Sequence, residues 1–273
     1  MFIIGAILRW AVLVGYAACA WLYLSRLLSA RPAENRGPEI LLSLVVLLHG
    51  ATLTEAALEH GRLIFLTTAL QATTVYAIVL AVWTLLIGRK SRNQAFGAFA
   101  VPIALLLYGV ALLHRPHPVG IKPYLDSSWF EVHAMSAFLG YAAFCLAFVA
   151  AVMYLLLMKE IRRRNLGRLF NRLPSLESLD QLGFHSILVG FLFFTAALVS
   201  GSIWGRQAFG HYFSGEIKEW LSFLTWLAAA VHLAMRYRAG WRGRTMALLS
   251  IAVFLISVLT WLGGGAASGR HSL

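Results

Sequence analysis

Residues 204–220 read WGRQAFGHYFSGEIKEW and lie between two long apolar stretches, 183–203 and 219–236. The segment is too polar to cross a bilayer, yet it is unusually aromatic for a connector between helices. Aromatic rings at this density are typical of the membrane interface, and they would equally suit a flat, largely apolar ligand lying on that surface. The rings belong to Trp204, Phe209, Tyr212, Phe213 and Trp220.

The composition places the chain among polytopic membrane proteins. Of its 273 residues, 60% are hydrophobic and only 12% are charged, which is more apolar than a soluble core of this size needs. The pattern of apolar stretches predicts an all-α bundle of about eight transmembrane helices, built as a single integral-membrane domain over residues 1–273. The predicted spans are 3–28, 40–58, 65–88, 95–114, 130–157, 183–203, 219–236 and 246–263.

The placement of the basic residues predicts the orientation of the chain. The net charge of +12 might suggest a nucleic-acid partner, but most of the 23 lysines and arginines fall in alternate connectors between apolar stretches. That pattern places those connectors in the cytoplasm. We therefore expect both termini and the 204–220 loop on the non-cytoplasmic side, a lipid bilayer as the surroundings and no nucleic acid. The basic segment 159–182 is expected to lie along the cytoplasmic surface.

Ionisable side chains inside a membrane are costly, so each is a candidate functional residue, and histidines dominate the set here. His133 opens the stretch 130–157 at its outer edge, and His271 follows the last apolar stretch on the same predicted side. Two imidazoles with a ring-lined surface between them would suit haem. The alternatives are an interfacial histidine bonded to a carbonyl group for His133 and a disordered tail for His271.

Two further histidines lie within predicted spans. His232 follows Glu219 by about 20 Å of helix and is expected toward the cytoplasmic leaflet, whereas His49 is expected near mid-membrane. Either could belong to a ligand site or donate a hydrogen bond across a helix interface. Cys19 and Cys145 lie in apolar stretches and form no CxxC or CxxCH pattern, so they predict buried thiols and no covalent attachment of haem.

The segment 200–265 is similar to the core of the cytochrome c assembly protein family, the CcsA/HemX-like haem-handling membrane proteins. Residues 129–144, WFEVHAMSAFLGYAAF, resemble the family's segment that opens with an outer haem-ligand histidine, which falls on His133. The ending SGRHSL places a second outer histidine on His271, and the family's histidine after the tryptophan-rich loop falls on His232. The residues that match in order are Trp204, Gly210, Tyr212, Lys218, Glu219, Thr225, Trp226 and Gly240-Trp241-Arg242-Gly243.

This resemblance implies a haem-handling protein of the bacterial inner membrane that is connected with cytochrome c assembly. It would hold non-covalent, b-type haem at the outer face through His133 and His271, with the 204–220 loop as a platform. His232, which the resemblance also makes an iron ligand, would belong to an inner site, and His49 would be a further haem-binding residue. Phe209, Phe213 and Gly215 stand where family members usually carry tryptophans, which reduces the stacking area.

The same resemblance bears on activity and partners. Thioether chemistry would take place on the apocytochrome within a complex that includes a membrane partner subunit, so we expect the chain not to be an enzyme on its own. Two alternatives remain. One is a membrane regulator or scaffold linked to haem biosynthesis, which would use the basic segment 159–182 to bind a soluble partner. The other is a small-solute transporter, for which the sequence shows no broken helix or inverted repeat.

Overall fold

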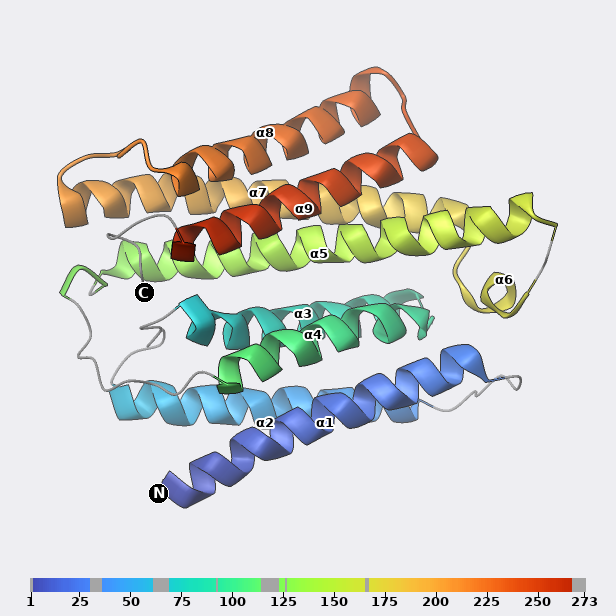
Figure 1. Ribbon diagram of the computed structural model, residues 1–273, viewed down its shortest axis with the longest axis horizontal. Coiled ribbons are helices and arrows are strands. Elements are labelled where there is room, and N and C mark those ends of the chain that lie inside the picture. The colour runs from blue at the N-terminus through green and yellow to red at the C-terminus, as the bar shows by residue number, and fades with distance from the viewer. Residues whose placement is uncertain are drawn as a thin grey trace. The chain divides into compact units, whose positions relative to one another are not determined.

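The computed structural model describes residues 2–29, 36–60, 69–91, 93–113, 123–125, 127–164 and 167–266, and these ranges contain helices and no strands (Figure 1). The helices are α1 (Phe2–Leu28), α2 (Gly37–His60), α3 (Ala69–Ser91), α4 (Ala95–Leu113), α5 (Ser128–Arg162), α6 (Arg168–Arg172), α7 (Leu176–Phe209), α8 (Ile217–Arg238) and α9 (Arg244–Ala266). A 3-10 turn, Pro123–Leu125, precedes α5.

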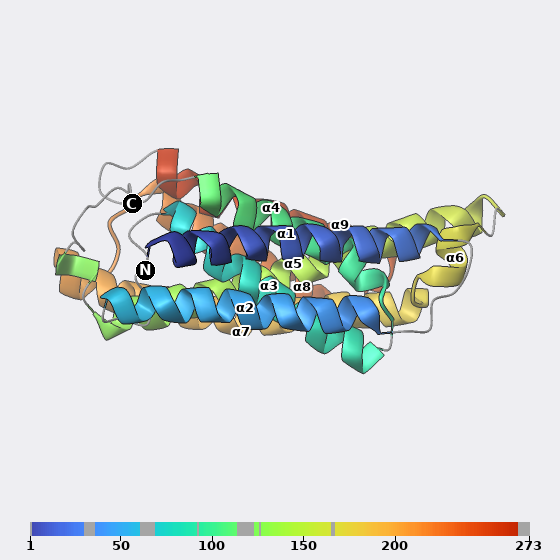
Figure 2. The same ribbon diagram turned by 90° about the horizontal axis from the view of Figure 1, so that it is seen from below.

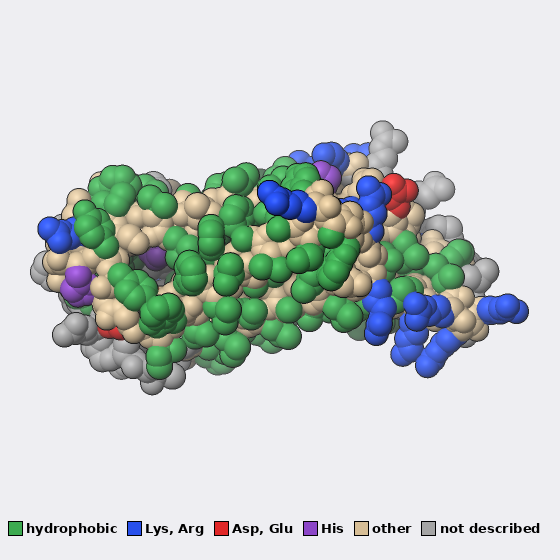
Figure 3. Space-filling model, turned by 90° about the horizontal axis from the view of Figure 1, so that it is seen from above, with side chains coloured by type: hydrophobic (Ala, Val, Ile, Leu, Met, Phe, Trp, Pro, Cys, Tyr) green, Lys and Arg blue, Asp and Glu red, His purple; other side chains and the backbone are tan. Residues whose placement is uncertain are grey.

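The long helices coincide with the predicted spans, which confirms the polytopic helical bundle. Backbone polar groups have no water to bond in hydrocarbon, so a helix satisfies them within its own segment. Seven helices in the described ranges are long and apolar enough to cross a membrane. Helix α8 has a similar length but carries Lys218 and Glu219 at its start and Arg236 and Arg238 at its end. Hydrophobic side chains cover most of the face shown in Figure 3.

Two boundaries differ from the sequence prediction. Helix α7 continues to Phe209, so the first part of the 204–220 segment is helical and the loop proper covers only residues 210–216. Gly210 ends this helix because its positive φ of 86° suits glycine and its N–H donates to the carbonyl of Arg206. The segment 159–182 is divided among the end of α5, the five-residue α6 and the start of α7. Its location on the cytoplasmic surface stays a prediction.

The chain divides into two compact units. The first comprises helices α1 to α4, α6 and the end of α5 beyond Leu155, and in it α1 packs against α2 and α4 (Figure 2). The second comprises α5 up to Leu155 together with α7, α8 and α9, and in it α8 packs against both α7 and α9. The description of residues 1–273 as one domain stays a prediction.

A buried polar cluster ties the helices of the first unit together. His49 on α2 is fully buried, and its two ring nitrogens lie 3.0 Å from the hydroxyl of Tyr16 on α1 and 2.9 Å from the hydroxyl of Thr74 on α3. The ring of Tyr108 on α4 meets the imidazole edge-on at a centroid distance of 4.7 Å. One histidine therefore contacts three other helices, and its buried polar atoms are satisfied.

Glycines let α5 and α7 approach closely in the second unit. A Cβ atom at Gly190 would come within 2.5 Å of the Phe144 ring, and one at Gly140 would lie 3.3 Å from the backbone nitrogen of Phe194. Small residues at helix interfaces allow this close packing in a membrane, where van der Waals contact drives association. The α5–α7 contact fixes the positions of the side chains at the ends of both helices.

We expect His49→Ala to destabilise the protein by on the order of 3 kcal/mol, because it leaves a cavity and removes the partner of two buried hydroxyls. The thermal unfolding midpoint of the detergent-purified protein measures this. His49→Gln, which retains hydrogen-bonding groups, should lose less. His185→Ala is the matched control because that side chain is exposed on α7. A midpoint for His49→Ala as high as that of the control would contradict the cluster's role.

The orientation is testable because the two native cysteines, Cys19 and Cys145, are buried and should label poorly. Gln207 and Arg242 are both exposed, the first near the end of α7 and the second in the turn between α8 and α9. Under the predicted orientation, a membrane-impermeant maleimide added to intact spheroplasts labels Gln207→Cys and not Arg242→Cys. Permeabilised membranes should label both, and the reverse pattern in spheroplasts would overturn the orientation.

Candidate functional site

The second unit contains an open cavity of about 260 Å³ at the end of the bundle where α5 and α8 begin and α7 ends. Its lining combines side chains from these three helices with the 210–216 loop. The residues that the argument uses are His133, Gly201, Trp204, Phe209, Tyr212, Phe213, Ser214 and Lys218.

His133 lies in the cavity wall with a fixed tautomer. Its Nδ1 is 2.8 Å from the carbonyl oxygen of Ala197 on α7, so Nδ1 carries the proton and donates it. The lone pair of the neutral ring is then on Nε2, which is the arrangement found in histidines that bind metals. Gly201 makes room for the ring, because a Cβ atom there would lie 2.6 Å from the His133 Nδ1.

Trp204 forms the neighbouring wall and is held from several sides. Its indole ring stacks on the His133 imidazole with centroids 6.0 Å apart and planes 17° apart. The indole N–H donates to the carbonyl of Tyr124 at 2.8 Å, and the Phe130 ring lies 5.1 Å away. Phe209 contacts the same indole edge-on at 5.7 Å. The imidazole and the indole are thus positioned together, with their polar N–H groups satisfied.

The 210–216 loop takes its shape from two glycines and one carboxylate. Gly210 and Gly215 both have positive φ angles, 86° and 78°, which side chains other than glycine rarely adopt. Glu219, in the first turn of α8, accepts hydrogen bonds from the backbone N–H groups of Ser214 and Gly215, each at 2.8 Å. An acidic residue that reaches back over a helix N-terminus in this way resembles a capping box, and it fixes the end of the loop.

Aromatic and cationic side chains surround the mouth of the cavity. Tyr212 and Phe213 are more than half exposed; the guanidinium of Arg206 lies over the Tyr212 ring at 5.3 Å, and Phe213 meets the Trp220 ring edge-on at 5.3 Å. Burial lowers the pKa of Lys218, and the nearby Glu216 carboxylate opposes that shift. Among the described residues the buried Ser214 hydroxyl has no hydrogen-bond partner.

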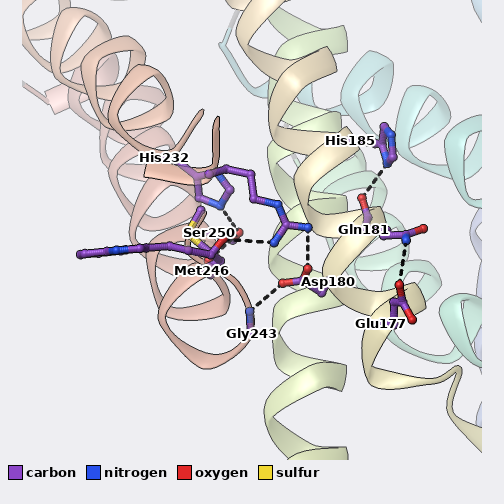
Figure 4. Close-up of polar contacts among 10 residues, drawn as sticks. Glu177, Asp180, Gln181, His185, His232, Gly243, Met246 and Ser250 are labelled. Atoms are coloured by element: carbon purple, nitrogen blue, oxygen red, sulfur yellow. Dashed lines mark hydrogen bonds and ion pairs between the residues drawn. The ribbon is translucent and has the colours of Figure 1, made fainter. Parts of the chain in front are cut away.

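His232 lies elsewhere in the same unit, about 14 Å along α8 from Phe223, the last residue of that helix in the cavity lining. Its polar neighbours are drawn in Figure 4. His232 is almost fully buried, and its Nε2 is 3.0 Å from the Ser250 hydroxyl on α9, while its Nδ1 has no partner among the described residues. Next to it, Asp180 at the start of α7 pairs with Arg236 at 2.6 Å and accepts the Gly243 N–H at 2.8 Å. This network ties α7 to the α8–α9 turn.

The cavity therefore brings together only part of the predicted set. His133, Trp204, Tyr212 and Phe213 line it, and Trp220 touches Phe213 from outside. His232 is at a different depth, and its role as an iron ligand stays a prediction. The hydrogen bonds of His49 in the first unit support the interhelical alternative for that residue. His271 lies outside the described residues.

Several residues of the site were not found from the sequence. Gly201, Ala197 and Tyr124 act through the absence of a side chain or through a backbone carbonyl, and such roles leave no residue-type signal. Asp180 could have been noticed as one of the few acids in the basic segment 159–182, but its partner Arg236 is distant in sequence. The small residues around Gly201 were the one feature of the sequence that indicated close packing at this position.

A solved structure has the same fold as this chain. The solved structure of "Cytochrome c Heme Lyase CcmF" aligns with a TM-score of 0.66 at 17% sequence identity, covering 98% of this chain and 47% of that one. At this identity the likeness shows the fold alone.

Sequence relatives show the family. "Cytochrome c biogenesis protein CcsA" of Prochlorococcus marinus (strain MIT 9301) is 32% identical over 202 residues, 66% of this chain and 65% of the relative. The protein of that name from Heterosigma akashiwo (strain NIES-293) is 28% identical over 219 residues, 67% of this chain and 68% of the relative. The match thus spans just under two thirds of the Prochlorococcus protein. The model of the family described as "Cytochrome C assembly protein" matches residues 66–268, and the chain belongs to the cytochrome c assembly protein family.

Proposed function

We propose that this chain holds haem non-covalently in the cavity of the second unit, at the outer face of a bacterial inner membrane, during cytochrome c assembly. The observation that carries the proposal is the His133 Nδ1–H bond to the Ala197 carbonyl, which directs the imidazole lone pair to Nε2. Haem, when bound, would supply an iron that accepts a nitrogen ligand. His133 is the proposed ligand within the cavity, and His271 is proposed as the second.

The other lining residues fit a porphyrin in shape and charge. Trp204, Phe209 and Phe213 offer apolar ring surfaces, as a flat macrocycle requires. Lys218 in the lining and Arg206 near it are cations suited to carboxylate groups such as propionates. The buried Ser214 hydroxyl, which lacks a partner among the described residues, supplies one more polar contact for a ligand. The cavity is open, so part of the macrocycle would remain accessible to a partner protein.

Family membership indicates the process in which this site would take part. Relatives named for cytochrome c biogenesis and the match to the family described as "Cytochrome C assembly protein" support a role in that process. We propose that the chain positions and protects haem, and that thioether bonds form on the apocytochrome within a complex that includes a partner subunit. His232 would serve an inner site that the outer cavity does not include.

Replacing His133 by glycine should abolish most haem binding, because it removes the proposed nitrogen ligand and leaves a space the size of the ring. The Soret absorption of protein purified from haem-replete cells measures this. Free imidazole added to His133→Gly should restore a Soret band, since it can occupy the vacated space and supply the same nitrogen. Loss of folding alone would not be reversed by imidazole.

His185→Gly is the matched control, because His185 also donates from Nδ1 to a backbone carbonyl, that of Gln181 at 2.7 Å, but lies on the exposed side of α7. It should retain the wild-type Soret band. Equal haem content in His133→Gly, His185→Gly and wild-type protein would refute the site and favour a regulator or scaffold that does not bind haem here.

Gly201→Ala should weaken haem binding without removing any ligand. The new methyl group would overlap the His133 ring and break its bond to Ala197, a loss of about 1 kcal/mol or roughly fivefold in haem affinity. Haem titration followed at the Soret band measures the change. Gly183→Ala, on the same helix with its nearest atom at an ordinary 3.9 Å, is the control. Identical affinities of the two variants would show that Gly201 does not set the position of the ring.

A further inference from the structure

A second cavity, of about 480 Å³, lies at one end of the first unit, and its lining shares no residue with the proposed haem site. Its lining comes from the end of α1, the start of α2, the end of α3, the start of α4 and the short helix α6. These helix ends adjoin connectors in which basic residues are concentrated. The fold therefore brings charged side chains that are distant in sequence together around one cavity.

The lining is strongly cationic. Among the described residues it contains four arginines and one carboxylate, that of Glu39, so the cavity has an excess of positive charge. The four arginines are Arg26 on α1, Arg36 immediately before α2, Arg89 on α3 and Arg172 on α6.

Hydrogen bonds to neutral oxygens position two of these guanidinium groups. Arg89 donates to the Ser43 hydroxyl at 3.1 Å, and Arg172 donates to the Ser29 carbonyl at 3.2 Å. Neutral acceptors orient a guanidinium without cancelling its charge, so Arg89 and Arg172 keep their attraction for an anion. Glu39 is 7% exposed and opposes part of that attraction. A group with two or more oxygens and a full negative charge, such as a phosphate, matches planar guanidinium donors.

The surroundings point to a lipid as the source of that phosphate. A neighbouring hollow of about 340 Å³ shares Arg36, Glu39 and Arg89 with the cavity and extends to Ile40 and Ser43 on the side of α2. From there Ile40, Leu44 and Leu47 form an exposed apolar stripe along α2, with exposed fractions of 60%, 58% and 70%. A free phosphate would use only the cavity, whereas a phospholipid would also cover the stripe with an acyl chain.

We infer that this arginine cavity binds the headgroup phosphate of an anionic phospholipid, whose acyl chain lies along the α2 stripe. Basic pockets between transmembrane helices suit such headgroups, because the phosphate sits at the depth where apolar helices end. The bound lipid joins α1, α2, α3 and α6 through one shared counter-ion. It contributes to the stability of the first unit and does not depend on haem.

The test uses delipidated full-length protein in a neutral detergent and its thermal unfolding midpoint as the readout. Added short-chain phosphatidylglycerol should raise the midpoint in a saturable manner, whereas short-chain phosphatidylcholine and inorganic phosphate at the same concentration should not. Phosphatidylcholine carries the same phosphate together with a choline cation, which the arginines repel, so an equal rise with it would mean that the cavity does not select an anionic headgroup. An equal rise with inorganic phosphate would mean a free-anion site. Either result would overturn the lipid assignment.

Arginine variants distinguish lipid binding in the cavity from a general attraction of the lipid to basic residues. Arg36→Gln with Arg89→Gln should weaken phosphatidylglycerol binding about 30-fold, at about 1 kcal/mol for each arginine. The matched control is Arg162→Gln with Arg163→Gln, two exposed arginines of the same unit outside the lining, and it should bind as the wild type does.

Glu39→Gln provides an independent change in the opposite direction, because it removes the negative charge from the lining while keeping the shape of the side chain. It should bind phosphatidylglycerol more tightly than the wild type. If both double variants weaken binding equally, or if Glu39→Gln leaves binding unchanged, the cavity is not the lipid site.

Discussion

The close contact between α5 and α7 is the constraint on which the candidate site depends. Gly140 and Gly190 let the two helices pack with backbone near backbone, and Gly201 extends this small-residue contact to the end of the bundle. Because helices are stiff, this packing sets the register between His133 on one helix and Trp204 on the other. Their stacked rings follow from glycines that themselves contribute no chemistry.

The sequence predicted the bundle well because long apolar stretches are a strong indication of membrane-spanning helices. Each apolar stretch must form a helix in hydrocarbon, so the long helices could be placed from hydropathy alone. Their ends were less certain, since helix ends depend on local capping: α7 runs on to Phe209 because the first residue that stops it is Gly210. The segment 159–182 was harder still, because its basic residues and its apolar spacing give no indication of where each helix ends.

The site could be predicted only where residue type carries the function. Histidine and tryptophan stand out in an apolar chain, so His133 and Trp204 were found, and the loop aromatics followed from their density. The sequence could not show that His133 bonds to the Ala197 carbonyl, since every residue has a carbonyl. Nor could it separate His49 from His232, because burial and partners depend on the neighbouring helices. Their surroundings now differ clearly: both ring nitrogens of His49 lie close to hydroxyls, whereas only one of those of His232 has a described partner.

The 210–216 loop is held by hydrogen bonds at both of its glycines. At Gly215 the chain is anchored, since its N–H and that of Ser214 both donate to the Glu219 carboxylate. At Gly210 the N–H donates to the carbonyl of Arg206 at 3.0 Å, and the carbonyl accepts from the Arg206 guanidinium at 3.1 Å. A loop whose backbone is fixed at both ends confines adjustment to its exposed side chains, Tyr212 and Phe213.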